Sequence, residues 1–89
     1  MRVSIIEPKG IIWESNIKEA ILPTQEGDLC ILDFHQPFLA RLKSGIIRFS
    51  QEAKRKTVGS VNRFPIKDGL ASMKGNELKI FAEILEPKC

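Results

Sequence analysis

Hydrophobic residues occur along the chain in short runs that alternate with polar residues, a spacing typical of β-strands rather than helices. Isoleucine, valine and phenylalanine, which favour strands, supply many of them. Turn residues separate the runs at short intervals. The pattern therefore predicts an all-β fold, an antiparallel β-sandwich or flattened barrel of about nine to ten short strands. The strands that we expect lie at 2–6, 11–13, 17–22, 29–32, 38–43, 46–50, 64–66, 69–74 and 77–85.

Residues 14–22 also allow a helix, because Glu14, Lys18 and Leu22 are spaced four residues apart. Pro23 would end such a helix after only two turns. The segment is short for a helix, and a strand is favoured.

Two polar or proline-containing stretches shape the second half of the chain. Pro65 between two apolar residues predicts an edge strand, because proline cannot donate a hydrogen bond within a sheet. Residues 51–57 are the most polar segment, which predicts a long hairpin loop.

A final hairpin is expected around Gly75-Asn76. Period-two spacing then predicts the core positions Ile47, Phe49, Leu78, Ile80, Ala82 and Ile84.

The composition fits one folded domain, residues 1–89, with 43% hydrophobic residues and a net charge of +3. No apolar run is long enough to span a membrane, and residues 1–10 do not resemble a secretory leader, so we expect a cytosolic or cytosol-facing protein. Cys30 lies within the apolar run 29–32 and is expected to behave as a small hydrophobic side chain. One histidine and no Cys-x-x-Cys pair predict no metal site and no cofactor.

Candidate chemistry is sparse. His35 is the only histidine and no motif gives it a nucleophile, so a structural or partner-contacting role is favoured over general-base catalysis. The carboxylates of Glu26, Asp28 and Asp33 flank the apolar run 29–32, where they suit turn formation or a contact surface better than a metal site. The basic run 54–56 (Lys54, Arg55, Lys56) allows a nucleic-acid surface as an alternative.

Several short motifs occur in an order and spacing that are more specific than any one of them. The longest is EGDLCILDFHQPF at 26–38, and the others are IIEPKG at 5–10, LKSGIIR at 42–48, DGLA at 68–71 and NELKI at 76–80. Together they resemble the N-terminal β-sandwich domain of the epsilon subunit of F-type ATP synthases, the counterpart of the mitochondrial delta subunit.

The chain departs from that family pattern at several positions. Cys30 stands where the family has Gly, Asp33 where it has Pro, Gln36 where it has Ala, and Asp68 where it has Gly. The loop 51–62 is longer than usual. The family's C-terminal helical hairpin has no counterpart after residue 85, so we expect this chain to lack the rotation inhibition, and in some bacteria the ATP binding, that belong to the hairpin.

The resemblance implies a non-catalytic rotor subunit of the central stalk, with the gamma subunit and the c ring as partners. It implies peripheral attachment at the cytoplasmic face of the inner membrane, in a bacterial or organelle-type complex. Carried over residue by residue, it places the c-ring contact at Glu26, Gly27, Asp28 and His35. The gamma-facing surface should contain exposed apolar residues such as Ile6 or Leu70. A small β-barrel that binds nucleic acid through the basic run 54–56 is the alternative.

Overall fold

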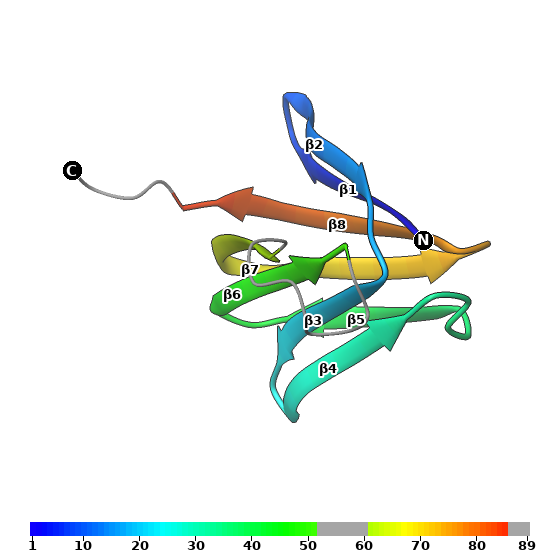
Figure 1. Ribbon diagram of the computed structural model, residues 1–89. Coiled ribbons are helices and arrows are strands. Elements are labelled where there is room, and N and C mark those ends of the chain that lie inside the picture. The colour runs from blue at the N-terminus through cyan, green and yellow to red at the C-terminus, as the bar shows by residue number, and fades with distance from the viewer. Residues whose placement is uncertain (52–60, 86–89) are drawn as a thin grey trace.

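The computed structural model describes residues 1–51 and 61–85, and within them every regular element is a β-strand. No helix in this part of the chain could cross a membrane. The strands are β1 (Arg2–Glu7), β2 (Gly10–Asn16), β3 (Glu19–Thr24), β4 (Gly27–Leu32), β5 (Phe38–Leu42), β6 (Gly45–Ser50), β7 (Val61–Lys74) and β8 (Glu77–Ile84) (Figure 1).

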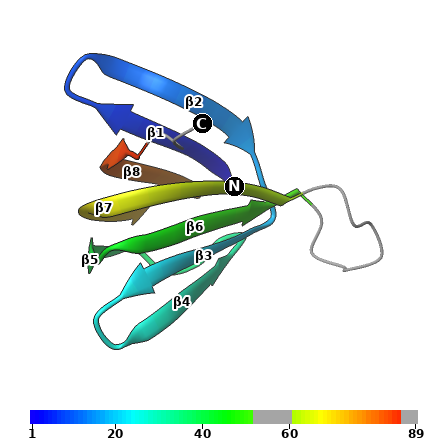
Figure 2. The ribbon, with the colours of Figure 1, turned by 90° about the vertical axis from the view of Figure 1, so that its left-hand side faces the viewer.

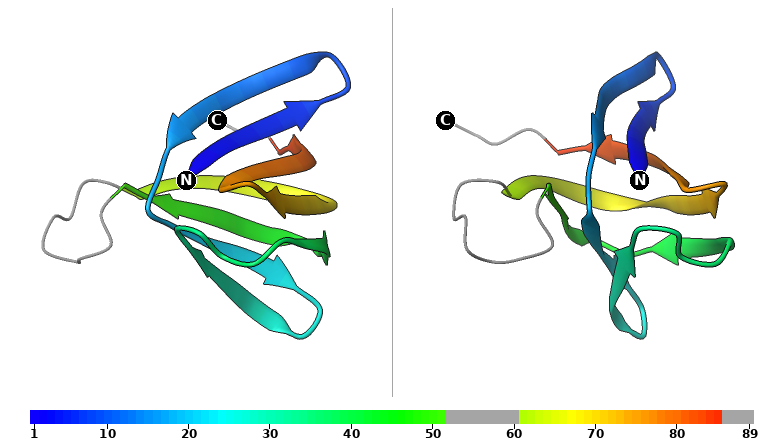
Figure 3. Two further views of the ribbon diagram at one scale, coloured as in Figure 1. Left: turned by 90° about the vertical axis from the view of Figure 1, so that its right-hand side faces the viewer. Right: turned by 45° about the vertical axis from the view of Figure 1, so that its right-hand side comes forward.

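One continuous sheet folds over on itself to make the sandwich. Its hydrogen-bonded order is β2-β1-β8-β7-β6-β3-β4, and β5 joins β7 outside this path. The long β7 belongs to both layers, because its first half pairs with β6 and its second half pairs with β8 and β5. The β1–β2 and β3–β4 hairpins therefore lie at opposite margins of the molecule (Figure 2). Figure 3 shows the same separation from two further directions.

The core lies between the two layers and follows the predicted period of two. Ile47, Phe49, Leu78 and Ile80 are fully buried, and Ala82 is nearly so. The predicted core position Ile84 is only half-buried, at the end of β8, where it packs against the core from one side. The predicted all-β sandwich is confirmed.

The ambiguous segment 14–22 is divided between β2 and β3, so the helical alternative is wrong. β3 begins at Glu19 and buries Ala20 and Leu22, which keeps the strand period through that stretch. The last hairpin turns at Gly75-Asn76 as expected. Both residues have positive φ angles, 60° and 57°, which match the twist of a tight two-residue hairpin turn.

The described residues form eight strands rather than nine to ten, because 61–74 is one bent strand and not two. The prediction of an edge strand at Pro65 is also wrong, since β7 lies between β6 and β8. The carbonyl of Pro65 accepts a hydrogen bond from the Leu85 N–H. The N–H and C=O groups of one strand residue point the same way, so the hydrogen bond that proline cannot donate would also be directed at Leu85. The missing donor therefore faces the place where β8 ends, one residue beyond the last paired position.

Cys30 is exposed, which corrects the expectation that its thiol behaves as a small hydrophobic side chain. The side chains of β4 alternate between the core and the outer face, and Cys30 points outward. In the run 29–32 only Ile31 is buried, and Leu32 is 51% exposed. The predicted loop 51–57 and the basic run 54–56 lie almost wholly outside the described residues, and only Gln51 is described.

Candidate docking face and the residues around it

Ile6 and Leu70, the two residues predicted to face the gamma subunit, lie in one row across three strands. Ile6 of β1 is opposite Phe81 of β8, and Phe81 is opposite Leu70 of β7. Ile6 is also paired with Ile11 of β2, which extends the row to a fourth strand. Cross-strand partners project from the same face of a sheet. Ile11, Ile6, Phe81 and Leu70 therefore form one apolar stripe, here called the Phe81 row.

The Phe81 row is open to solvent. Ile11 is 57% exposed, and Phe81 and Leu70 are each 44% exposed. The neighbouring residue Ile80 is fully buried, so β8 sends alternate side chains to the core and to this outer face. Contiguous exposed apolar side chains on a small domain are typical of a surface that binds another protein.

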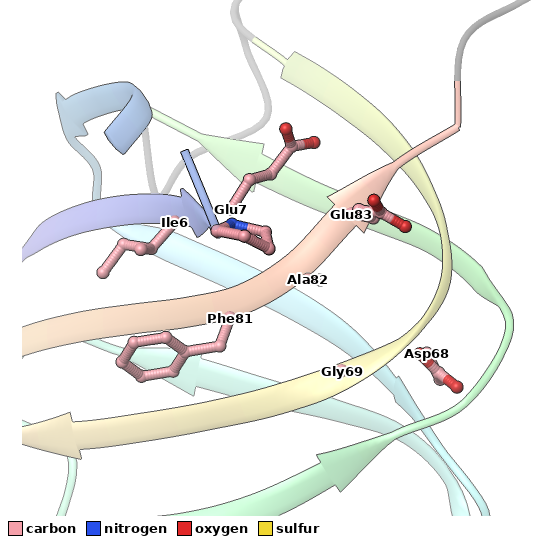
Figure 4. A pocket seen from close by; sticks show the side chains of 8 residues that line it. Ile6, Glu7, Asp68, Gly69, Phe81, Ala82 and Glu83 are labelled. Carbon is pink, nitrogen blue, oxygen red and sulfur yellow. The ribbon is translucent and has the colours of Figure 1, made fainter. Parts of the chain in front are cut away.

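A shallow hollow of about 520 Å³ borders the row between β1, β8 and the bend of β7 (Figure 4). Ile6 and Phe81 line it together with the carboxylates of Glu7, Asp68 and Glu83. One Glu7 oxygen accepts a hydrogen bond of 2.9 Å from the backbone N–H at the end of β8, which ties the β1–β2 turn to that strand. The hollow at the Ile6 end of the row is therefore acidic.

The Leu70 end of the row is mainly basic. A second hollow of about 520 Å³ adjoins Leu70 and Phe81 there, shares Asp68 with the first hollow and is also lined by Arg41, Lys43 and Lys67. Arg41 is the direct cross-strand partner of Leu70. Acidic side chains therefore adjoin the Ile6 end of the apolar stripe and basic side chains adjoin the Leu70 end, a difference that can fix the orientation of a docked partner.

Gly69 lets β7 bend beneath the row. The register shifts between Ile66 and Gly69, and a Cβ at Gly69 would lie 2.5 Å from the carbonyl oxygen of Phe81 and 2.7 Å from Cβ of Ala82. Only glycine fits this approach. The exposed neighbour Asp68 stands where the related family has another glycine, and its side chain is accommodated because it reaches the acidic hollow.

The predicted ring-facing turn joins β3 to β4. Gly27 has a φ of 117°, and the Thr24 hydroxyl donates to its carbonyl at 2.6 Å. Glu26 is exposed at this turn. Asp28 does not bond within the turn, because its Oδ2 accepts from the Arg48 guanidinium at 3.0 Å. With 60% of its side chain exposed, Asp28 still presents a carboxylate to solvent.

His35 lies beyond the other end of β4, in the loop before β5. The strand covers four residue steps between Asp28 and Leu32, or about 13 Å at the usual rise. The structure therefore does not bring His35 to the turn that carries Glu26, Gly27 and Asp28. The exposed His35 ring packs edge-on against Phe38, and its Nδ1 lies 2.9 Å from the Gln36 carbonyl oxygen.

Asp33 holds three separate segments together near His35. Its carboxylate pairs with the N-terminal ammonium of Met1 and, at 3.5 Å, with the Lys18 ammonium. The hydrogen bond from the Met1 ammonium, more than the nearby Lys18 charge, lowers the pKa of the Asp33 carboxyl below its ordinary value. Asp33 is one of the positions at which the chain departs from the family pattern.

Sequence reasoning missed Phe81 and Ile11. The signal for Phe81 was available, since an aromatic residue stands out of phase with the core positions Leu78, Ile80 and Ala82. Ile11 begins the consecutive apolar run 11–13, which shows no alternation that would assign one of its residues to an outer face. Within 1–51 and 61–85 no group of three or more histidine, cysteine or carboxylate side chains is arranged to hold a metal ion.

Comparison with known proteins gives a consistent match. The family model for the ATP synthase delta/epsilon chain β-sandwich domain matches residues 1–88. The chain is similar to the chloroplast ATP synthase epsilon chain of Emiliania huxleyi, with 35% identity over 80 residues that cover 90% of this chain and 57% of that one. It is 30% identical to the epsilon chain of a Synechococcus strain over 86 residues, which cover 97% of this chain and 58% of that one. The chain therefore spans somewhat less than two thirds of these relatives.

Two solved structures share the fold at lower sequence identity. One chain comes from the central stalk and c ring of the Tetrahymena thermophila mitochondrial ATP synthase, with a TM-score of 0.74 and 17% identity, covering 96% of this chain and 65% of that one. Another comes from the Euglena gracilis mitochondrial ATP synthase, with a TM-score of 0.79 and 19% identity, covering 93% of this chain and 51% of that one.

Proposed function

Because the chain belongs to the ATP synthase delta/epsilon chain β-sandwich domain family, we propose that it is a non-catalytic rotor subunit of an F-type ATP synthase. In this role it joins the gamma subunit to the c ring and helps to couple proton flow to ATP synthesis. It is attached peripherally, through the complex, to the cytoplasmic face of the inner membrane or its organelle equivalent. No comparison supports the nucleic-acid alternative.

The observation that carries the proposal is the exposed Phe81 row. Ile6 and Leu70, the two residues expected to face the gamma subunit, are the cross-strand partners of Phe81 on its two sides. Burying an exposed aromatic ring between two aliphatic side chains is the kind of contact that dominates protein interfaces. The acidic hollow near Ile6 and the basic hollow near Leu70 predict a gamma surface with cations facing Glu7 and anions facing Arg41.

The ring contact is assigned to the exposed turn with Glu26, Gly27 and Asp28. This turn lies at the margin formed by β3 and β4, the opposite margin from β1 and β2 (Figure 2). Asp28 is braced by Arg48 and can still meet a basic group on the ring. Since His35 lies beyond the far end of β4, we assign it to a partner contact separate from that turn.

Torque transmission requires a body that does not shear between its two contacts. The two layers share β7, so hydrogen bonds run without interruption from the β1–β2 margin to the β3–β4 margin. A close-packed core of isoleucine, leucine and phenylalanine fills the space between them. These features suit a rigid coupling element.

Reconstitution tests the proposal. Membrane vesicles carrying the cognate ATP synthase without its epsilon subunit should regain proton-driven ATP synthesis when this chain is added. Phe81→Ala should raise the concentration of chain needed for restoration at least about tenfold, because aromatic hot-spot residues contribute about 2 kcal/mol or more to binding. Ile46→Ala is the matched control, since Ile46 is 49% exposed on the other layer. Full restoration by Phe81→Ala, or none by the unmodified chain, would contradict the proposal.

A further inference from the structure

A second exposed face lies on the outer side of the other layer. Register places Cys30, Ile21, Arg48 and Arg63 in one row across β4, β3, β6 and β7. A second row runs beside it on the same face, with Leu32 at one end and Val61 at the other. These two side chains are 51% and 37% exposed. This surface, here called the arginine face, is separate from the Phe81 row.

Two arginines stand directly opposite each other on the arginine face. Arg48 of β6 pairs in register with Arg63 of β7, and like charges in that arrangement destabilise a sheet. Asp28 neutralises only Arg48, through one terminal nitrogen. Among the residues that the structure describes, no carboxylate forms an ion pair with Arg63.

The Arg48 guanidinium is also incompletely bonded. Its Nε is shielded from solvent and has no hydrogen-bond partner in the described structure. A buried donor without an acceptor costs free energy that an incoming acceptor would recover. The two arginines border a hollow of about 190 Å³ that Ile21 and Val61 also line, with Glu19 at its edge as the one carboxylate among the described residues that line it. The arginine face therefore combines an apolar surface with unsatisfied positive charge.

We propose that the arginine face docks a polypeptide segment of a partner protein that carries a carboxylate side chain flanked by apolar residues. The carboxylate would lie between Arg48 and Arg63 and relieve their repulsion, and the flanking residues would cover Ile21 and Val61. A nucleic-acid strand fits less well, because its regularly spaced phosphates would also meet the carboxylates of Glu19 and Asp28, which border the same rows. A peptide brings a single carboxylate, which it can place between the two arginines. This surface does not depend on the role assigned to the Phe81 row.

Cys30 provides a natural tether for the test. It lies in the same row, two strand spacings or about 10 Å from Arg48 and three or about 14 Å from Arg63. A peptide with the sequence acetyl-Cys-Gly-Leu-Glu-Leu-amide, joined to Cys30 by a disulfide, has the reach to place its glutamate near the arginines. Tethering raises the effective concentration to the millimolar range, so weak recognition becomes measurable.

The measurement is the equilibrium of disulfide exchange between the Cys89→Ser chain and each peptide, followed by mass spectrometry at low ionic strength. The glutamate peptide is compared with otherwise identical glutamine and lysine peptides. Partial burial, followed by the Glu19 carboxylate, raises the pKa of the Cys30 thiol, so exchange is run at mildly alkaline pH to reach equilibrium. We expect the glutamate peptide to be captured at least about fivefold more strongly than the glutamine peptide.

Substitutions locate the effect. Arg63→Gln should reduce the preference for glutamate to less than about twofold, whereas Arg41→Gln, an equal change in net charge on the opposite layer, should leave it intact. Unfolding curves for both variants check that the fold is retained. The proposal is overturned by equal capture of the glutamate and glutamine peptides, or by a preference that survives Arg63→Gln. Stronger capture of a thiol-bearing oligonucleotide would overturn the choice of partner.

Discussion

Replacing Ile80 by alanine should lower the free energy of unfolding by about 2–5 kcal/mol. Ile80 is fully buried at the centre of β8, opposite Ile5 of β1 and Ala71 of β7. The substitution removes three carbons, worth about 2.4 kcal/mol at 0.8 kcal/mol for each. A cavity adds to this loss, because hydrogen-bonded strands on both sides prevent the wall from collapsing inward.

Phe81→Ala is the matched comparison, since Phe81 follows Ile80 and points to the outer face. Because its ring is already 44% exposed, truncation should cost only roughly 1 kcal/mol in the isolated chain. The order of the two costs is opposite to that expected from side-chain size alone. This order of costs is expected only if β8 presents alternate residues to the core and to solvent, as it does in the structure.

Urea unfolding followed by tryptophan fluorescence measures both costs. Trp13 is the only tryptophan, and its ring stacks on Phe49 with centroids 5.3 Å apart, so its emission changes when the core opens. A domain of this kind has about 5–15 kcal/mol of stability in total, so the Ile80 variant should unfold at a much lower urea concentration. An Ile80→Ala cost equal to or below that of Phe81→Ala would refute the assigned register.

Changes at three further positions test other parts of the structure. Gly69→Ala should lower the free energy of unfolding by about 1–3 kcal/mol in the same assay, because its Cβ would collide with the Phe81 carbonyl oxygen; an unchanged midpoint would exclude that close approach. Asp33→Asn should destabilise the chain at neutral pH, since the Met1 ammonium lowers the pKa of the Asp33 carboxyl. A carboxyl whose pKa is lowered in the folded state stabilises the fold at pH values above its pKa in the unfolded chain. The difference in unfolding free energy between the variant and the unmodified chain should therefore shrink below pH ~4, as Asp33 becomes protonated; a difference independent of pH would refute the pairing. Asp28→Asn should change the stability of the isolated chain by at most about 1 kcal/mol, as for exposed ion pairs. Asp28→Lys should reduce ATP synthesis in reconstituted vesicles, and undiminished synthesis with normal assembly would argue against the ring contact.

Much of the fold could be predicted because strand period and turn chemistry are local properties. The Gly75-Asn76 hairpin and the core positions Ile47 and Ile80 follow from residues within a few positions of each other. The interior position of Pro65 could not be predicted, because it depends on where a partner strand ends nineteen residues later, at Ile84. The exposure of Cys30 likewise depends on which face of β4 meets the core, and an uninterrupted apolar run does not indicate that face.

The sequence pointed to single residues of the candidate site but not to the surface that they form. Ile6 and Leu70 were identified as exposed apolar candidates, yet only the register shows that Phe81 joins them. For the acidic turn, the sequence pointed to local turn chemistry at Asp28, whereas the structure gives that role to Thr24 and pairs Asp28 with Arg48. Long-range pairings of this kind leave no mark on the sequence near either residue.

The central proposal is that the Phe81 row docks the chain on the gamma subunit of an ATP synthase. Calorimetric titration of the chain into its purified cognate gamma subunit tests it most directly. The account predicts saturable one-to-one binding that weakens at least about tenfold in Phe81→Ala and stays unchanged in Ile46→Ala. Absence of binding, or binding that Phe81→Ala leaves unaltered, would contradict it.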